Sequence, residues 1–224
     1  MKDPLAGSAW SDCSTVEGFV RSAPNATLLA YAQRAAGQRR LRIADIGCGA
    51  GRNAVPLASA GADVIATDLS LPMAAAASAR ADHHRLLIAL APMDALPVRD
   101  RSIDMVVAHG IWNLARSDAE WHRAAGEASR IAAPHARLFV FTFSRHTLPP
   151  ACEPVAGERF TFTQFSGAPQ IFMTDEELIT ALARHGFHPD PDLPLREHNL
   201  PPPGQPRLGG PPVIYEGGFV FKGV

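Results

Sequence analysis

Short apolar runs alternate in the first two thirds of the chain with longer segments whose apolar positions recur every three or four residues. The short runs are typical of buried strands, and the longer period is typical of helices. The pattern predicts strands over residues 41–46, 62–66, 86–90, 103–108 and 137–143, and helices over 53–60, 71–80 and 117–133. Strands that alternate with helices form a parallel sheet covered on both faces, so we expect an α/β fold.

Helix starts are marked by residues that satisfy free backbone N–H groups. The sequences Ser117-Asp-Ala-Glu120 and Thr174-Asp-Glu-Glu177 both match a capping box, in which a hydroxyl and a carboxylate each accept such a hydrogen bond. Pro56 cannot lie deep inside a helix, so the helix over 53–60 begins no earlier than about Arg52. Residues 47–51 are therefore expected to form a loop.

The last third of the chain has a different pattern. It predicts a strand-like run over residues 160–165, a helix over 174–185, and a final strand over 213–222 that runs antiparallel to the others. Residues 189–212 hold nine of the 20 prolines, which excludes a helix or a central strand there and indicates a long loop. Too few residues follow this loop for a second domain, so we expect a single domain over residues 1–224.

Composition and charge mainly exclude certain classes of protein and kinds of site. Apolar residues make up 46% of the chain and charged residues 19%, which is enough for one sizeable core. The formal net charge is −1, without the basic excess typical of nucleic-acid binders, so we expect no nucleic-acid partner. Three cysteines without a CxxC pair disfavour a disulfide framework and a zinc site. Because the sequence has neither a signal-peptide pattern nor a membrane-spanning apolar run, we expect a cytoplasmic protein without a membrane partner.

The sequence Ile43-Ala-Asp-Ile-Gly-Cys-Gly-Ala-Gly51 places three alternating glycines between a predicted strand and a predicted helix. Glycine lets a ligand approach the main chain without a Cβ in the way, and a plain turn does not need three glycines. The dinucleotide fingerprint G-x-G-x-x-G would require glycine at position 52, where this chain has Arg52. Asp45 would also repel a pyrophosphate, whereas it suits a cationic ligand. Both residues disfavour a nicotinamide oxidoreductase.

Four motifs, in order, resemble those of the class I S-adenosylmethionine-dependent methyltransferases. Residues 45–51 resemble the first motif, and Asp68 lies where the family's acidic residue binds both ribose hydroxyls. Residues 93–97 resemble the motif whose Asp meets the adenine amino group, and residues 103–108 resemble the fourth-strand motif. The resemblance implies a doubly wound, seven-stranded, mostly parallel sheet with helices on both faces and an antiparallel final strand.

The same resemblance implies S-adenosyl-L-methionine as the cofactor. Because the sequence has neither a HExxH motif nor a carboxylate cluster, we expect no metal. The residues expected to bind it follow the first four strands: Asp45, Gly47, Cys48, Gly49, Gly51, Asn53, Asp68, Leu69, Met93, Asp94, Ala95, Ala108 and His109. As alternatives, Asp68 caps the next helix and Asp94 closes a turn before Pro97. Cys48 has no adjacent base in the sequence and is expected to pack near the ligand rather than act as a nucleophile.

Methyl transfer from a sulfonium is an in-line displacement that positioning and desolvation can accelerate. The catalytic candidates follow the fourth strand. His109 either accepts a proton from an acceptor hydroxyl, thiol or amine or bonds the backbone. Trp112 either faces the methyl group or fills the core, and Asn113 either contacts the acceptor or begins a turn. Further residues expected to bind the acceptor are Trp10, Arg145 and Tyr215, of which Arg145 suits an anionic group or an ordinary surface position.

The continuation of the glycine loop, residues 51–54, is similar to the small-molecule type of the family, which includes tellurite-resistance and thiol methyltransferases. We therefore expect a small-molecule acceptor, a lid-like N-terminal segment over residues 1–36, and acceptor-side loops over residues 144–173 and 189–212. The alternatives are an RNA or protein methyltransferase, which the near-neutral charge disfavours, and a protein that binds the cofactor without turnover. The sequence predicts neither the methylated atom nor the oligomeric state.

Overall fold

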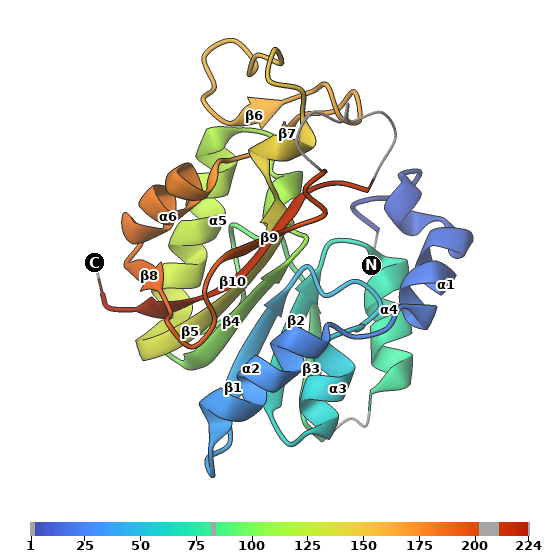
Figure 1. Ribbon diagram of the computed structural model, residues 1–224. Helices are drawn as coiled ribbons and strands as arrows, with labels where there is room; N and C mark the ends of the chain where they lie inside the picture. Colours follow the sequence, from blue (N-terminus) through green and yellow to red (C-terminus); the bar gives the residue numbers. More distant parts are fainter. Residues whose placement is uncertain (1–2, 82–83, 202–210, 224) are drawn as a thin grey trace.

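The computed structural model describes residues 3–81, 84–201 and 211–223. Its main sheet has eight strands in the order β3-β2-β1-β4-β5-β10-β8, with β9 also paired to β10 (Figure 1). The strands are β1 (Arg42–Ile46), β2 (Asp63–Asp68), β3 (Leu86–Leu90), β4 (Ile103–His109), β5 (Ala132–Phe143), β8 (Phe187–Pro189), β9 (Arg196–His198) and β10 (Ile214–Phe221). The first five pair in parallel, and β10 is antiparallel to β5. This confirms a mostly parallel sheet with an antiparallel final strand.

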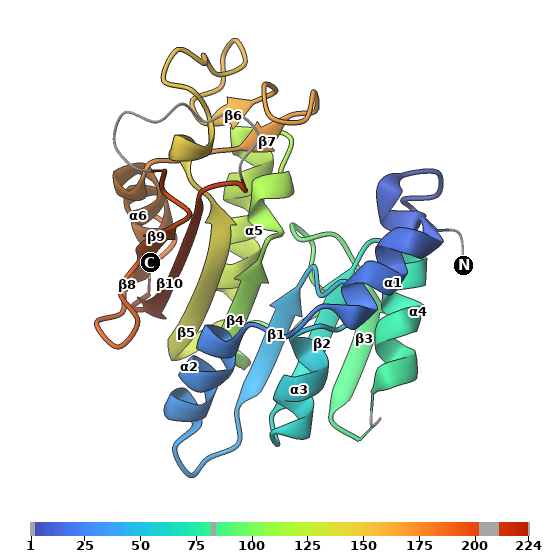
Figure 2. The same cartoon turned by 45° about the vertical axis from the view of Figure 1, so that its right-hand side comes forward.

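Helices cover both faces of this sheet (Figures 1 and 2). They are α1 (Cys13–Arg21), α2 (Ala26–Ala36), α3 (Ala54–Ser59), α4 (Leu71–Arg80), α5 (Asp118–Ile131) and α6 (Asp175–Ala183), with short 3-10 turns η1 (Ala9–Ser11), η2 (Trp112–Leu114) and η3 (Arg145–Thr147). One buried cluster joins α5 and α6 to the sheet, and a second joins α2 and α3 to it. In β1, Ile43 belongs to the second cluster and its neighbour Ala44 to the first. A strand buried on both faces needs such a continuous apolar run.

The predicted strands and helices of the first two thirds are confirmed, with ends shifted by a few residues. The largest shift is in β5, which begins at Ala132 directly after α5 ends at Ile131. The capping box at Thr174 is confirmed in full. The one at Ser117 is only half formed, because the Glu120 carboxylate accepts from the backbone N–H of Arg116 instead of that of Ser117.

The last third holds short strands that the sequence pattern did not predict. The segment predicted as a strand over 160–165 contains only β6 (Thr161–Phe162), which pairs with β7 (Gln170–Ile171) in a separate small sheet. Within the proline-rich loop, β9 lies beside β10 at the edge of the main sheet, where prolines are tolerated. Residues 202–210 of that loop lie outside the described residues.

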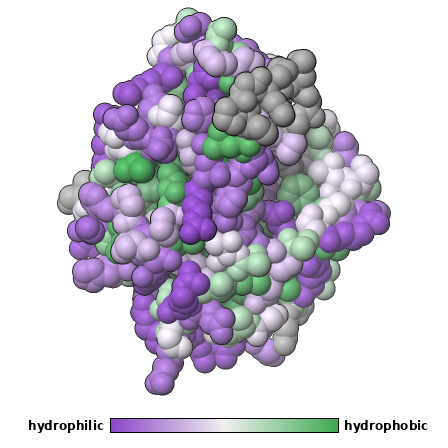
Figure 3. All heavy atoms as spheres, viewed as in Figure 1, coloured by the Kyte–Doolittle hydropathy of each residue, from purple (hydrophilic) through white to green (hydrophobic). Residues whose placement is uncertain are grey.

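The molecular surface seen in the view of Figure 1 is mostly polar, with smaller apolar areas between the polar side chains (Figure 3). Among the described residues, no helix combines the length and the apolar character that crossing a bilayer requires.

Candidate functional site

The glycine loop lies directly after β1, at the carboxyl edge of the sheet. Gly47, Gly49 and Gly51 have φ angles of +67°, +54° and +77°, a region that other residues adopt only with strain. A Cβ on Gly47 would lie 2.6 Å from the side chain of Ile111, which follows β4. The Cys48 amide donates to the Thr67 carbonyl of β2 at 2.9 Å and ties the loop to the next strand. The loop therefore needs glycine both for its backbone and for the close approach of Ile111.

Asp68 ends β2 and holds the loop from the other side. One carboxylate oxygen accepts from the amide of Gly49 and the other from the amide of Ser70, each at 2.8 Å. Burial raises the pKa of Asp68, although these backbone hydrogen bonds oppose the shift. The N-cap of α4 is Ser70, whose hydroxyl accepts from Met73, so the alternative that Asp68 is this cap is wrong.

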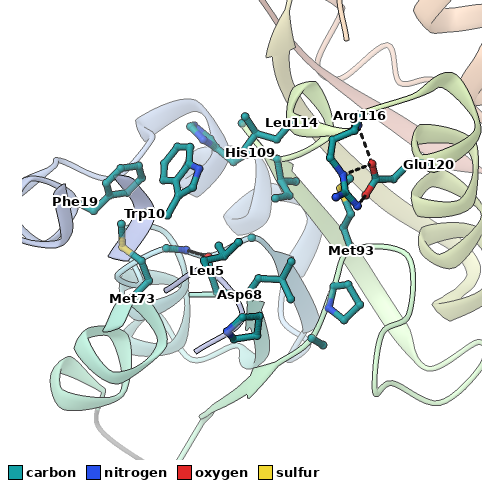
Figure 4. A pocket seen from close by; sticks show the side chains of 18 residues that line it. Leu5, Trp10, Phe19, Asp68, Met73, Met93, His109, Leu114, Arg116 and Glu120 are labelled. Atoms are coloured by element: carbon teal, nitrogen blue, oxygen red, sulfur yellow. Dashed lines mark hydrogen bonds and ion pairs between the residues drawn. The ribbon is translucent and has the colours of Figure 1, made fainter. Parts of the chain in front are cut away.

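A cavity of about 460 Å³ opens above the loop and Asp68 (Figure 4). Its volume lies in the range of small-molecule sites. The sequence-predicted residues in its wall are Trp10, Gly47, Gly49, Asp68, Leu69, Met93 and His109. They come from the carboxyl ends of β1 to β4 and from the N-terminal segment. The cavity thus lies where the order of the sheet reverses between β1 and β4, the usual ligand position in such folds.

Asp45 lies under the loop rather than in the cavity wall. Its side chain is buried, and one carboxylate oxygen has no hydrogen-bond partner among the described residues. Burial raises the pKa of Asp45 to about 7, while the Arg52 guanidinium opposes this shift and Asp68 adds to it. The free protein therefore buries a carboxyl group whose pKa lies near neutral pH and one of whose oxygens has no hydrogen-bond partner within the described part of the chain. A cationic ligand nearby would favour the ionised form of this group.

His109 ends β4 and lines the cavity. Its ring stacks on Phe141 with a centroid distance of 4.2 Å, and Nδ1 lies 2.8 Å from Nη2 of Arg52. Burial lowers the pKa of His109 to about 4, and Arg52 contributes in the same direction. The imidazole is therefore uncharged at neutral pH. Its expected catalytic role remains a prediction.

The other two catalytic candidates are core residues of η2. Trp112 is 1% exposed and packs edge-on against Trp121, and Asn113 is 3% exposed. Neither belongs to the cavity wall, although Trp112 Nε1 and Asn113 Oδ1 have no hydrogen-bond partner among the described residues. The burial of Trp112 fits its packing alternative, and Asn113 lies in the short η2 turn. A contact of either residue with an acceptor remains a prediction.

Two candidates for acceptor binding make structural contacts instead of lining the cavity. The Arg145 guanidinium bonds the backbone carbonyls of residues 148, 149, 150 and 152 and lies 4.7 Å from the ring centroid of Phe162. Arg145 therefore anchors the loop that follows η3. Tyr215 is 2% exposed within β10, and burial raises its pKa to about 12. Trp10 alone of the three faces the cavity.

The remaining cofactor candidates do not line the cavity. Asp94 makes a 3.0 Å ion pair with Arg123 of α5, and Ala95 beside it is exposed. Asn53 accepts from the Asn25 amide at 3.0 Å. Cys48 is buried, and burial raises the pKa of its thiol well above the ordinary value, as expected of a packing residue. Gly51 packs against α4 through Ala77, and Ala108 is buried in β4.

The N-terminal segment supplies further wall residues of the cavity. Its helix α1 brings Phe19 edge-on to Trp10, with ring centroids 5.9 Å apart. The Ser70 hydroxyl donates to the Trp10 carbonyl at 2.9 Å, beside Asp68. Figure 4 shows Trp10 and Phe19 on one side of the cavity and Arg116 with Glu120 on the other. The remaining wall residues are Pro4, Leu5, Phe19, Met73, Ala91, Pro92, Gly110, Ile111, Leu114, Arg116 and Glu120.

The fold and the site together define a doubly wound ligand-binding domain with a glycine loop and an acidic second-strand end. Residues 44–140 match the family described as a methyltransferase domain. This match, together with the fold, makes the chain similar to the class I S-adenosylmethionine-dependent methyltransferases over that part of its length. The narrower likeness to tellurite-resistance and thiol methyltransferases is not among these findings and remains a prediction.

Among curated proteins, the chain is similar to a demethylmenaquinone methyltransferase of Thermus thermophilus. The two are 36% identical over 107 residues, which cover 46% of this chain and 47% of the relative. A demethylmenaquinone methyltransferase of Renibacterium salmoninarum is 34% identical over 110 residues, 49% of this chain and 44% of that protein. The chain thus spans about half the length of the curated relatives it matches.

Solved structures share the fold at low sequence identity. A SAM-dependent methyltransferase of Methanosarcina mazei has a TM-score of 0.69 and 20% identity, covering 91% of this chain and 100% of its own. The 1,6-didemethyltoxoflavin-N1-methyltransferase of Burkholderia thailandensis, solved with 1,6-didemethyltoxoflavin and S-adenosylhomocysteine, has a TM-score of 0.65 and 19% identity. That match covers 94% of this chain and 81% of the solved chain.

Proposed function

We propose that the protein transfers the methyl group of S-adenosylmethionine to a small-molecule acceptor by in-line displacement. The observation that carries this proposal is the cavity at the carboxyl edge, in which the glycine loop and Asp68 form one wall. Relatives and structural neighbours named as methyltransferases of a demethylmenaquinone and of a didemethyltoxoflavin support a small acceptor.

The residues present fit this cofactor. Asp68 lines the cavity with a carboxylate that the amides of Gly49 and Ser70 hold in place, as a pair of ribose hydroxyls would require. Asp45, buried beneath the loop, supplies a carboxyl group whose ionised form a ligand that carries an ammonium and a sulfonium group would favour. Leu69, Met93 and Ile111 add apolar wall area for an adenine ring.

The bound cofactor would supply an electrophilic methyl group on a sulfonium. The chain itself contributes position and exclusion of water. Trp10 and Phe19 close one side of the cavity, and His109 at the end of β4 faces the same space. Holding two reactants in line within such an enclosure accelerates a displacement without a covalent intermediate.

The acceptor class is tested by incubating the purified protein with methyl-labelled S-adenosylmethionine and a bacterial lysate separated into small molecules, RNA and protein. We expect label in the small-molecule fraction with the wild-type chain and little label with Asp68→Ala. The control is Asp63→Ala, because Asp63 lies on the same strand at the end away from the cavity.

The other outcomes favour the alternatives. Label in the RNA or protein fraction would contradict a small acceptor and indicate a macromolecular substrate. Cofactor binding without label in any fraction would contradict turnover and favour a protein that binds S-adenosylmethionine without catalysis.

A further inference from the structure

The position of the base within the proposed cofactor site follows from the order of the strands. Asp68 would hold the ribose at the end of β2, and the glycine loop lies on the β1 side of it. Asp45 beneath that loop suits the ammonium and sulfonium groups, so the adenine would extend the other way, toward β3. Residues 91–93 follow β3 and belong to the cavity wall. They therefore mark the base end of the cavity.

Helix α5 lies along the segment that follows β3. Near its start, Arg123 makes the 3.0 Å ion pair with Asp94. One turn further along the helix, the Glu127 carboxylate accepts from the Leu96 amide at 2.7 Å. These contacts bring the N-terminal end of α5 beside the base end of the cavity.

An ion pair at this end of α5 supplies the charged groups of the wall there. Arg116 and Glu120 both line the cavity, and Figure 4 shows them on the same side of it as Met93. Oε2 of Glu120 accepts from the Arg116 amide at 2.7 Å and from Nε at 3.1 Å, and Oε1 accepts from Nη2 at 3.1 Å. Burial alone would raise the pKa of Glu120, but the hydrogen bonds from Arg116 lower it, so the carboxylate is ionised at neutral pH.

The Glu120 carboxylate has room for one more donor, whereas Asp94 is turned away. Within the described part of the chain, Oε1 of Glu120 accepts a single hydrogen bond, and a carboxylate oxygen can accept two. Asp94 is the residue that the sequence resemblance assigns to the adenine amino group. It does not line the cavity, and its Oδ2 accepts from Nε of Arg123. The carboxylate that lines the base end is therefore that of Glu120.

We propose that Glu120, held in place by Arg116, accepts a hydrogen bond from the adenine amino group and selects a 6-amino purine over a 6-oxo purine. This inference rests on the proposed cofactor. An ionised carboxylate only accepts hydrogen bonds, so it suits the amino N–H groups and faces the lone pairs of a 6-oxo group unfavourably. Arg116 is a positioning residue, because its side chain and its backbone amide both hold the carboxylate.

Calorimetric titration with S-adenosylhomocysteine and with S-inosylhomocysteine, which carries a 6-oxo purine, tests this selection. The wild type should bind the adenine ligand about tenfold more tightly, since the oxo ligand leaves a hydrogen bond to a charged group unmade. Glu120→Gln should bring this ratio close to one, because an amide offers both a donor and an acceptor. Arg116→Met should also lower the ratio, since the carboxylate loses both side-chain hydrogen bonds. A purely structural effect of either substitution would weaken both ligands equally and leave the ratio unchanged.

Asp94→Asn makes the same chemical change at the competing carboxyl group and should keep the wild-type ratio. A ratio lost in Asp94→Asn and kept in Glu120→Gln would overturn the inference and assign the amino group to Asp94. Equal binding of the two ligands to the wild type would overturn it as well. Absence of any S-adenosylhomocysteine binding to the wild type would instead contradict the proposed cofactor itself, so the two failures are distinguishable.

Discussion

Replacing Gly47 by alanine should lower the free energy of unfolding through two effects, one on the backbone and one on packing. The backbone at Gly47 has φ of +67°, where a Cβ costs roughly 1–2 kcal/mol. The new Cβ would also lie 2.6 Å from Cδ1 and 2.8 Å from Cβ of Ile111. Since the Ile111 Cβ is fixed to its backbone, relief requires the loop after β4 to move, and such overpacking costs about 1–3 kcal/mol. We therefore expect the free energy of unfolding to fall by roughly 2–5 kcal/mol and cofactor binding to weaken.

The matched control is Gly157→Ala. Gly157 has φ of +84°, and a Cβ there would meet nothing within 4 Å, so it carries the backbone cost alone. Denaturant unfolding gives the free energy of unfolding of both variants. The two values are comparable when the slope of this free energy against denaturant concentration is the same in both variants. Gly47→Ala should be less stable than Gly157→Ala by about 1–3 kcal/mol. Equal losses in the two variants would refute the claim that Ile111 packs against the glycine loop.

Three further predictions follow from buried groups and helix ends. The pKa of Asp45 rises from 3.8 to about 7 on folding, so its stabilising contribution to the free energy of unfolding is fully present below pH 3.8 and is lost as the pH rises toward 7. Asp45→Asn should therefore flatten the pH dependence of the free energy of unfolding across this window, and an unchanged dependence would contradict the burial argument. Trp112→Ala should lower the unfolding free energy by about 3–5 kcal/mol through an emptied core site, and a loss below 1 kcal/mol would argue against its role in the core. Thr174→Ala should lower it by about 1 kcal/mol, since it removes one half of a complete capping box; thermal unfolding with no change in midpoint would speak against that cap.

Much of the sheet could be predicted from the sequence because its signals are local. The run at 86–90 and the helix over 71–80 match β3 and α4 to the residue. Parallel strands buried on both faces must be apolar throughout, and glycine or capping residues mark their ends. The edge strands β8 and β9 lacked this signal, since they are three residues long and lie among prolines.

The candidate site was predictable where a residue's position depends on the end of a strand. The glycine loop, Asp68, Met93 and His109 follow β1 to β4 and meet at one edge because parallel strands end together. Trp112 and Arg145 also follow strands, but their side chains turn into the core and onto nearby backbone carbonyls. Side-chain direction after a strand depends on turn geometry, which composition does not specify.

Pro4 and Leu5, which the N-terminal segment also adds to the cavity wall, could not be predicted from local patterns. Asn25 at the start of α2 is hydrogen-bonded to Asn53 and Glu216, which lie far from it in the chain. Asn25 and Arg52, which contact His109, likewise lie 84 and 57 positions away from it in the chain. Such contacts require the assembled fold.

Calorimetric titration of the purified protein tests the central claim most directly. S-adenosylmethionine, S-adenosylhomocysteine and NAD are titrated into the wild type, Asp68→Ala and the control Asp63→Ala, after any co-purified ligand is removed. We predict that the first two ligands bind to the wild type and the control, that Asp68→Ala binds them much more weakly, and that NAD does not bind. Absence of binding by both S-adenosyl ligands, or equal binding to Asp68→Ala, would contradict the assignment of the cavity as the cofactor site.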